Sequence, residues 1–297
     1  MQSSIVYFTR DISPAGLLKI YQALGVTLQG NVAVKISTGE PGGHHYLQPA
    51  LIAPLVNQLH GTIVECCTAY RGRRFTAADH WQAIREHGFL DIAPCDIMDE
   101  AGEMSIPTRT AGRHLHGYNL VGDHLNRYQS MLMLSHFKGH AMGGFGGALK
   151  NMSIGVASRN GKAWIHSVGR TTDPDTMWGL TEDQDGFLES MAEACSSVVD
   201  YFGPENLLYI NVANNLSIDC DCDANPHAPE MADIGIFAST DPVALDQCCY
   251  DQIVNADDPG KAALINRMNE KHGLHIIEEA VRLGLGLPTY HVVDLDR

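Results

Sequence analysis

Short apolar segments alternate with helix-forming segments along the whole chain, and this alternation is the strongest constraint on the fold. Apolar runs predict buried strands at residues 5–8, 31–36, 62–65, 131–134, 207–212 and 234–237. Apolar spacing and helix-start signals predict helices at 14–24, 49–59, before Gly88, at 187–199 and from Pro242 onward. Strands that alternate with helices build βαβ units. We therefore expect an α/β fold with a mostly parallel sheet, helices on both of its faces and long functional loops.

The sequence contains no Pro-, Gly- or Ser-rich linker, internal repeat or low-complexity block, so we expect a single α/β domain over residues 1–297. Its 20 basic and 35 acidic residues give a formal charge of −15, which argues against a nucleic-acid partner. The longest apolar run, residues 131–134, is far shorter than the roughly 20 residues that span a bilayer. These features predict a cytoplasmic protein that binds a small anionic molecule rather than a membrane, and they leave homo-oligomer formation open.

A glycine-rich segment, residues 135–151, directly follows the predicted strand at 131–134. It should therefore lie at the carboxyl end of that strand, where open α/β sheets bind ligands. Converging backbone N–H groups of its glycines would bind an anion, so the predicted anion site is Gly143, Gly144, Gly146, Gly147, Lys150 and Asn151. The candidate catalytic residues, with the histidines as general acid or base, are His136, Lys138 and His140. The alternative is a tight loop whose glycines only permit close backbone contact.

Cysteine placement suggests a metal site, because eight cysteines in a reducing compartment are not expected to form disulfides. Cys220 and Cys222 flank one aspartate in an acidic loop after a predicted buried strand. Nearby carboxylates raise the pKa of a thiol, whereas a bound metal deprotonates it. Zinc, iron or an iron–sulfur cluster would suit the predicted ligands, which are Cys66, Cys220 and Cys222. The alternatives are a chance pair of exposed thiols at 220 and 222, and core packing at Cys66.

The other cysteines are weaker candidates for chemistry. Core packing is expected where cysteines fall in phase with apolar helix faces, at Cys195, Cys248 and Cys249. The roles of Cys67 and Cys95 stay open. Lys162 follows Asn160-Gly161, a turn signal, and is expected to face solvent.

Several motifs occur together, and in this order, in one known family. They are residues 65–66, 70–74, 83–89, 96–99, 136–151, 220–222, 232–236, 241–247 and 284–286. On these motifs the chain resembles the family called domain of unknown function 362, whose longer members are described as uncharacterised iron–sulfur centre proteins. The resemblance covers nearly the whole chain and implies an α/β fold with an iron–sulfur or other metal centre, but no defined reaction. Many relatives also carry a ferredoxin-like Cys-x-x-Cys-x-x-Cys run, which this sequence lacks, so a cluster here would depend on Cys66, Cys220 and Cys222.

Three functional classes fit these features. The leading expectation is a metal- or iron–sulfur-dependent enzyme, an oxidoreductase among the options, that acts on a small anionic substrate. A non-catalytic protein that carries a metal or cluster would use the same thiols without the glycine loop. A cofactor-binding regulatory module would need only the glycine loop.

Overall fold

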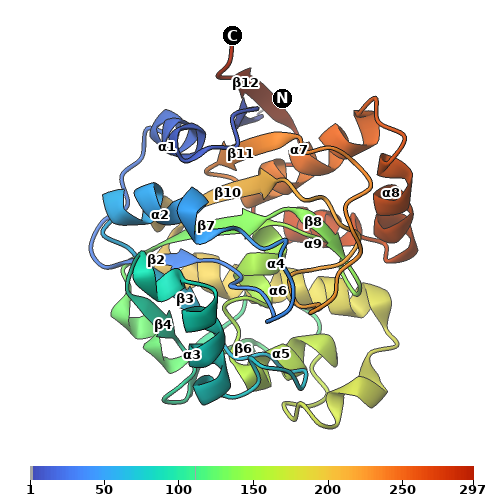
Figure 1. Ribbon diagram of the computed structural model, residues 1–297. Helices are drawn as coiled ribbons and strands as arrows, with labels where there is room; N and C mark the ends of the chain where they lie inside the picture. The colour runs from blue at the N-terminus through green and yellow to red at the C-terminus, as the bar shows by residue number, and fades with distance from the viewer. Residues whose placement is uncertain (1–2, 111) are drawn as a thin grey trace.

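The structure, a computed structural model, describes residues 3–110 and 112–297. In this part of the chain eight strands form one sheet, in the order β12-β1-β11-β10-β7-β2-β3-β4 (Figure 1). In that order the strands are β12 (Tyr290–Asp294), β1 (Ser4–Thr9), β11 (Gly235–Ser239), β10 (Leu207–Ala213), β7 (Ser130–His136), β2 (Val32–Lys35), β3 (Thr62–Glu65) and β4 (Cys95–Ile97). Neighbouring strands are parallel except where β11 pairs with β1 and β10. The predicted α/β fold with a mostly parallel sheet is confirmed.

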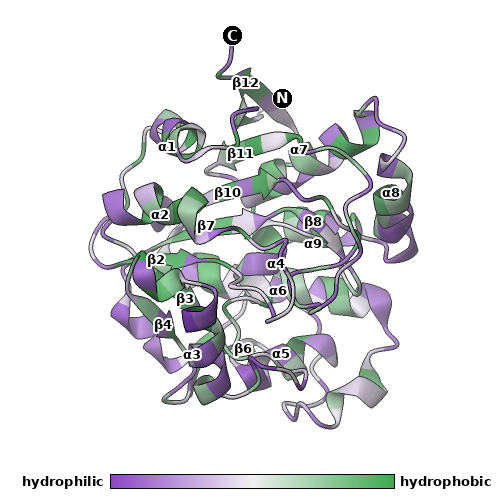
Figure 2. Ribbon diagram, in the orientation of Figure 1, coloured by the Kyte–Doolittle hydropathy of each residue, from purple (hydrophilic) through white to green (hydrophobic). Residues whose placement is uncertain are grey.

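Helices cover both faces of the sheet. One face packs on α1 (Pro14–Ala23), α2 (Pro49–Gln58) and α3 (Ala77–Glu86). The other packs on α4 (Ala148–Ser153), α5 (Arg159–His166), α6 (Gln184–Phe202), α7 (Pro242–Asn255) and α9 (His275–Arg282), while α8 (Lys261–Glu270) packs beside α7. Figure 2 shows α3 and α8 carrying both hydrophilic and hydrophobic residues, as expected for helices with one face on a core. None of the described helices is long and apolar enough to cross a bilayer.

The central strands are buried on both sides because successive side chains point to opposite faces. In β7, Met131 and Met133 join the core under α4 and α6, whereas Leu132 and Leu134 join the core under α1 and α2. All residues of β7 and β10 are buried. This two-sided burial explains why these strands are continuous apolar runs in the sequence.

Helix starts follow the capping signals in the sequence. The Ser13 hydroxyl accepts a hydrogen bond from the Gly16 N–H at the start of α1. The Asp241 carboxylate accepts from the N–H groups of Val243 and Ala244 at the start of α7. A proline at the first helical position fixes the backbone in both helices.

Two short antiparallel pairs lie outside the main sheet. They are β5 (Glu103–Pro107) with β6 (Tyr118–Gly122), and β8 (Lys138–His140) with β9 (Gly144–Gly146). Each of the six strands predicted from apolar runs is present. The strands of the two short pairs, together with β4 and β12, do not coincide with any of these predicted runs, so they were not predicted.

Candidate functional site

A cavity of about 350 Å³ lies at the carboxyl ends of the parallel strands. Lys35 is the last residue of β2 and Glu65 the last residue of β3, and both line the cavity. Lys150 on α4 and Cys220 in the loop after β10 line it as well. Segments distant in the sequence therefore meet at the strand edge where α/β sheets bind ligands, around a volume suited to a small molecule.

The β8 strand brings two of the candidate catalytic residues to this cavity. Lys138 and His140 are two residues apart in β8, so both side chains lie on the same face of the strand, and both line the cavity. Between them, the Gly139 N–H donates to the Ser217 carbonyl at 2.8 Å. A Cβ at Gly139 would lie 2.4 Å from the Ile218 carbonyl oxygen, so only glycine lets β8 approach the loop that carries Cys220.

The His140 ring is neutral and its hydrogen bonding is defined. Its Nδ1 accepts from the backbone N–H groups of Met142 and Gly143, at 3.2 and 2.9 Å, so the ring proton lies on Nε2. Burial lowers the pKa of His140 well below its ordinary value, and the charges of Lys150 and Lys138 lower it further. A neutral imidazole can act as a metal ligand or as an N–H donor.

His140, Cys220 and Cys222 form a group that could hold a metal. One potential ligand atom from each residue lies within 4.8 Å of the others. Cys220 and Cys222 are paired as a disulfide in the structure. Because a metal binds thiolates rather than a disulfide, the ligand-competent form of this group is the reduced pair.

Asp221, between these cysteines, organises the polar residues beneath the cavity. Its carboxylate accepts from Lys138 Nζ at 2.8 Å and pairs with His136 Nδ1 at 2.8 Å. His136 Nε2 lies 2.6 Å from the Asn214 carbonyl oxygen, so both ring nitrogens are held by loop residues. Burial alone would raise the pKa of Asp221, but Lys138 and His136 hold it well below its ordinary value. His136 therefore anchors the loop and does not line the cavity.

The cavity wall has an excess of positive charge, although the whole chain is acidic. Two carboxylates, Glu65 and Asp221, line it together with five cationic side chains, Lys35, Arg74, Lys138, Lys150 and Lys162. Lys162 is 6% exposed, so the prediction that it faces solvent is wrong. The Ser158 hydroxyl accepts from the Gly161 N–H, and this cap makes the predicted turn the first turn of α5.

The predicted anion site divides in the structure. Lys150 and Asn151 line the cavity. The four glycines lie in β9 or beside it, where the Gly143 N–H donates to His140. The N–H groups of Ala148 and Leu149, which begin α4, donate to the buried carboxylate of Asp246 at 2.8 and 2.9 Å. The Asp246 carboxylate thus occupies the backbone N–H groups at the start of α4 that could otherwise bind an anion.

Asp246 also accepts from the Asn211 side chain at 2.7 Å, which ties α7 to β10 and α4. Burial raises the pKa of Asp246 to about 6, although its three N–H donors oppose the shift.

Cys66 lines the cavity but lies outside the group of His140, Cys220 and Cys222. Its thiol donates to the Val156 carbonyl at 3.3 Å, and burial raises its pKa well above the ordinary value, with the Asp99 charge adding to the shift. The three cysteines predicted to pack in the core do so. Cys195, Cys248 and Cys249 lie in helices and are at most 1% exposed.

Sequence reasoning missed several residues of the site. Lys35 and Lys162 were not among the candidates, and Glu65 was noted only as the neighbour of Cys66. Glu65 accepts from the Thr38 N–H at 3.0 Å and contacts His80 Nε2 at 3.0 Å. A charged residue at the end of an otherwise apolar strand, as at Lys35 and Glu65, was the available signal.

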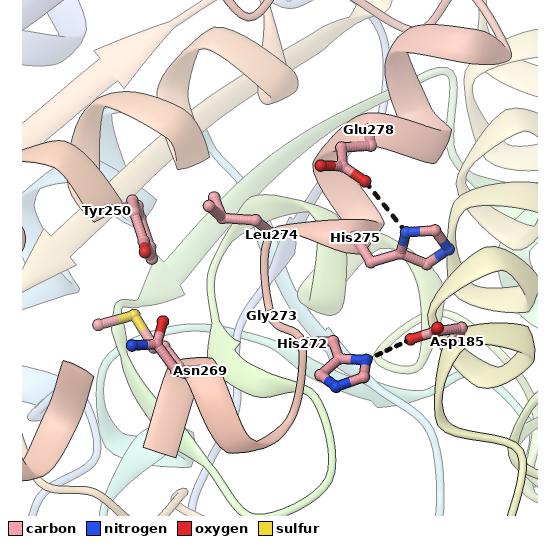
Figure 3. Close-up of a pocket in the computed structure, with 9 residues that line it drawn as sticks. Asp185, Tyr250, Asn269, His272, Gly273, Leu274, His275 and Glu278 are labelled. Atoms are coloured by element: carbon pink, nitrogen blue, oxygen red, sulfur yellow. Dashed lines mark hydrogen bonds and ion pairs between the residues drawn. The ribbon is translucent and has the colours of Figure 1, made fainter. Parts of the chain in front are cut away.

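A second cavity, of about 330 Å³, lies where α8 gives way to α9 (Figure 3). Two histidines in it are paired with acids, His272 with Asp185 at 2.7 Å and His275 with Glu278 at 3.1 Å. His275 also contacts Glu189 on α6 at 3.1 Å. These pairs link α6 to the α9 segment, which is a structural role.

His275 should make stability depend on pH. Burial alone would lower the pKa of His275, but Glu189 and Glu278 raise it above the ordinary 6.5. A raised pKa in the folded state stabilises below about pH 6.5, and this stabilisation is lost as the pH rises through the folded value. We expect the free energy of unfolding to fall less between about pH 6 and 8 in His275→Gln than in the wild type. Denaturant titrations at several pH values check this, with the exposed His291→Gln as control; parallel curves for wild type and His275→Gln would contradict it.

Comparisons with known proteins identify the family of this chain but no reaction. A family model described as "Domain of unknown function (DUF362)" matches residues 32–251, more than half of the chain. A comparison with curated proteins finds no match.

Two solved structures are similar to this one. One is titled a lactate racemase apoprotein from Thermoanaerobacterium thermosaccharolyticum, at 15% identity and a TM-score of 0.45, covering 84% of this chain and 57% of that chain. The other is a protein from Thermotoga maritima, at 11% identity and a TM-score of 0.43, covering 91% of this chain and 58% of that chain. The chain thus spans less than two thirds of the length of either protein.

Proposed function

This chain belongs to the DUF362 family, whose description names no reaction, and from the site itself we propose that it is a metal-dependent enzyme acting on a small anionic substrate. The observation that carries the proposal is the position of His140, Cys220 and Cys222, whose ligand atoms lie within 4.8 Å of one another at the wall of a cation-rich cavity. Metal donors and an anion site thus share one volume, as metal-assisted catalysis requires.

The donor set favours zinc or iron over a hard cation. Thiolate and imidazole ligands suit zinc and iron, whereas magnesium and calcium need oxygen ligands. The buried carboxylate between the two cysteines, that of Asp221, is engaged by Lys138 and His136. Two cysteines also fall short of the four that usually hold an iron–sulfur cluster. We therefore propose a mononuclear site in the reduced protein.

Three protein ligands leave one position of a tetrahedral site open, as in catalytic zinc sites. A metal bound there would supply Lewis acidity toward an oxygen of the substrate. The chain's own contribution is to bind the anion and to exclude water. Lys138 is held in place by Asp221, and the Lys150 amine lines the same cavity. This adjacency favours an enzyme over a non-catalytic metal carrier.

The disulfide favours a second candidate, a thiol–disulfide redox centre at Cys220 and Cys222. Oxidation of the two thiols releases two protons and two electrons and forms the S–S bond. In this alternative the reduced protein would hold no metal, and the thiols would titrate as a two-electron couple.

The Cys220→Ser/Cys222→Ser double variant should lose bound metal, because a serine hydroxyl is a poor ligand for zinc or iron. The wild type, purified without oxygen and with a reductant, should hold about one metal ion per chain. Metal-to-protein stoichiometry by elemental analysis makes the measurement. Wild type reoxidised to the disulfide should lose its metal as the double variant does.

The matched control is Cys248→Ser, at a buried core position of α7. It should retain its metal but lose about 1–3 kcal/mol of stability through a buried hydroxyl. Full occupancy in the double variant would remove the thiol site from consideration. A metal-free but redox-active wild type would favour the thiol–disulfide centre.

A further inference from the structure

The Lys150 amine differs from the other amines of the cavity because no described residue accepts its hydrogen bonds. Lys35 Nζ donates to Ile36 and Asn151, and Lys138 Nζ donates to His136 and Asp221. Lys162 Nζ donates to the Ala157 carbonyl at 2.6 Å. Within residues 3–110 and 112–297, Lys150 Nζ has no hydrogen-bond or ion-pair partner, although the residue lines the cavity. Among the amines described here, that of Lys150 is therefore free to contact a molecule in the cavity.

The surroundings of Lys150 favour the neutral amine. Burial lowers its pKa to about 7, and the nearby charges of Lys138 and Lys35 add to the shift, while Asp221 opposes it. An ordinary lysine has a pKa near 10.4, so at neutral pH Lys150 holds about a thousandfold more of the nucleophilic form. Desolvation beside a second cation is a known way to activate a lysine for attack on a carbonyl group.

The cavity also indicates what such a carbonyl compound would carry. Three further basic side chains, Lys138, Lys162 and Arg74, are held in place by hydrogen bonds and ion pairs, and they line the cavity together with Lys150. A carboxylate on the ligand would complement this charge. The volume of about 350 Å³ admits a molecule of a few carbon atoms. A small molecule that carries a carbonyl group for the amine and an adjacent carboxylate for the basic side chains is a 2-oxo carboxylate.

We propose that Lys150 forms an imine with a small 2-oxo carboxylate, which deepens the proposed function and rests on its anion-binding cavity. The amine nitrogen attacks the carbonyl carbon, and a C–N bond forms as a proton passes from nitrogen to oxygen. The hydroxyl of this carbinolamine then leaves, and the oxygen departs as water with both amine hydrogens. The C=N bond replaces the C=O bond, so the step needs no oxidant or reductant.

Borohydride trapping tests the imine directly. The chelator-treated, metal-free protein is incubated at neutral pH with pyruvate, glyoxylate or 2-oxoglutarate, then reduced with sodium cyanoborohydride and analysed by peptide mass mapping. We expect at least about tenfold more adduct on residue 150 than on any lysine outside the cavity, and several-fold more than on Lys35, whose pKa burial lowers only to about 8. The metal-free protein keeps this result independent of the metal site.

Two variants separate the covalent step from anion binding. Lys150→Arg keeps a cation but cannot form the imine, so its adduct should fall at least about tenfold while binding remains. Lys19→Arg, at an exposed lysine of α1 outside the cavity, should keep the adduct on residue 150. Binding is followed by the fluorescence of Trp178, which lines the cavity and is 50% exposed.

Each outcome is decisive. An adduct on residue 150 supports the imine. Saturable binding of the 2-oxo acids without an adduct overturns the imine and leaves the anion site of the proposed function standing. Absence of binding by all three acids overturns both the imine and the anion site, while the metal stoichiometry still tests the metal site separately. Far-UV circular dichroism confirms that each variant is folded.

Discussion

Replacement of Asp221 by alanine should lower the free energy of unfolding by about 3–5 kcal/mol, the usual cost of leaving a buried charge without its partner. Asp221 is 6% exposed and pairs with Lys138 and His136, which are 6% and 5% exposed. Its loss leaves the buried Lys138 amine without its counter-charge and His136 Nδ1 without its partner. It also frees the loop that carries Cys220 and Cys222.

Urea titrations followed by far-UV circular dichroism give the free energies. The matched control is Asp223→Ala, an exposed acid in the same loop, which accepts only a local hydrogen bond from the Asn225 N–H. We expect this control to change stability by less than about 1 kcal/mol. Equal losses in the two variants would refute the role assigned to the buried ion pairs.

The pH dependence of the Asp221 effect follows from its lowered pKa. The folded value lies below the ordinary 3.8, so the stabilisation is present above pH 3.8 and is lost as the pH falls through the folded value. The stability difference between wild type and Asp221→Ala should therefore be constant at neutral pH and shrink in acid.

Replacement of Asp246 by alanine should also cost about 3–5 kcal/mol, since each buried donor left unpaired costs about 1–3 kcal/mol. Asp246 is fully buried, and its carboxylate accepts from Ala148, Leu149 and Asn211. The first two are the initial N–H groups of α4, the helix that carries Lys150. The loss should therefore reach the cavity as well as the core.

The same titrations measure this loss, and adduct yield on residue 150 reports its effect on the site. Asp246→Asn keeps one acceptor oxygen and should lose less than the alanine variant. Asp251→Ala, on the same helix, removes partly exposed hydrogen bonds with Gln247 and Tyr290 and should cost about 1 kcal/mol. An Asp246→Ala protein as stable as Asp251→Ala would contradict the capping role.

The elements that could be predicted are those whose burial gives them a recognisable local sequence, such as a run of apolar residues. β7 and β10 are buried on both faces, so they read as uninterrupted apolar runs. The antiparallel direction of β11 was not predictable, because strand direction depends on pairing with β1 and β10, which lie far away in the sequence. The β8–β9 hairpin was not predicted, because the glycines in it are equally typical of an anion-binding loop.

Part of the candidate site could also be predicted. Cys220, Cys222 and Lys150 were expected at the carboxyl ends of the strands, because each follows a buried strand or the glycine segment after one, and all three line the cavity there. Cys66 was predicted as the companion of the two thiols, but the structure places His140 beside them. This arrangement depends on where β8 lies beside the 214–223 loop, which the local sequence does not show. Lys162 was misplaced because a local turn signal cannot reveal that Ser158 caps a helix there.

Several cavity side chains lie beyond the ends of the strands, although Cys66 and Ile154 also belong to the larger apolar core. Met142 and Trp178 line the cavity and are partly or largely exposed. Substitutions at such positions reshape the ligand site without opening voids between the sheet and its helices. Proteins with this fold can therefore differ in the ligand they bind without a change in the core that stabilises them. A shared fold is for this reason a poor guide to a shared reaction.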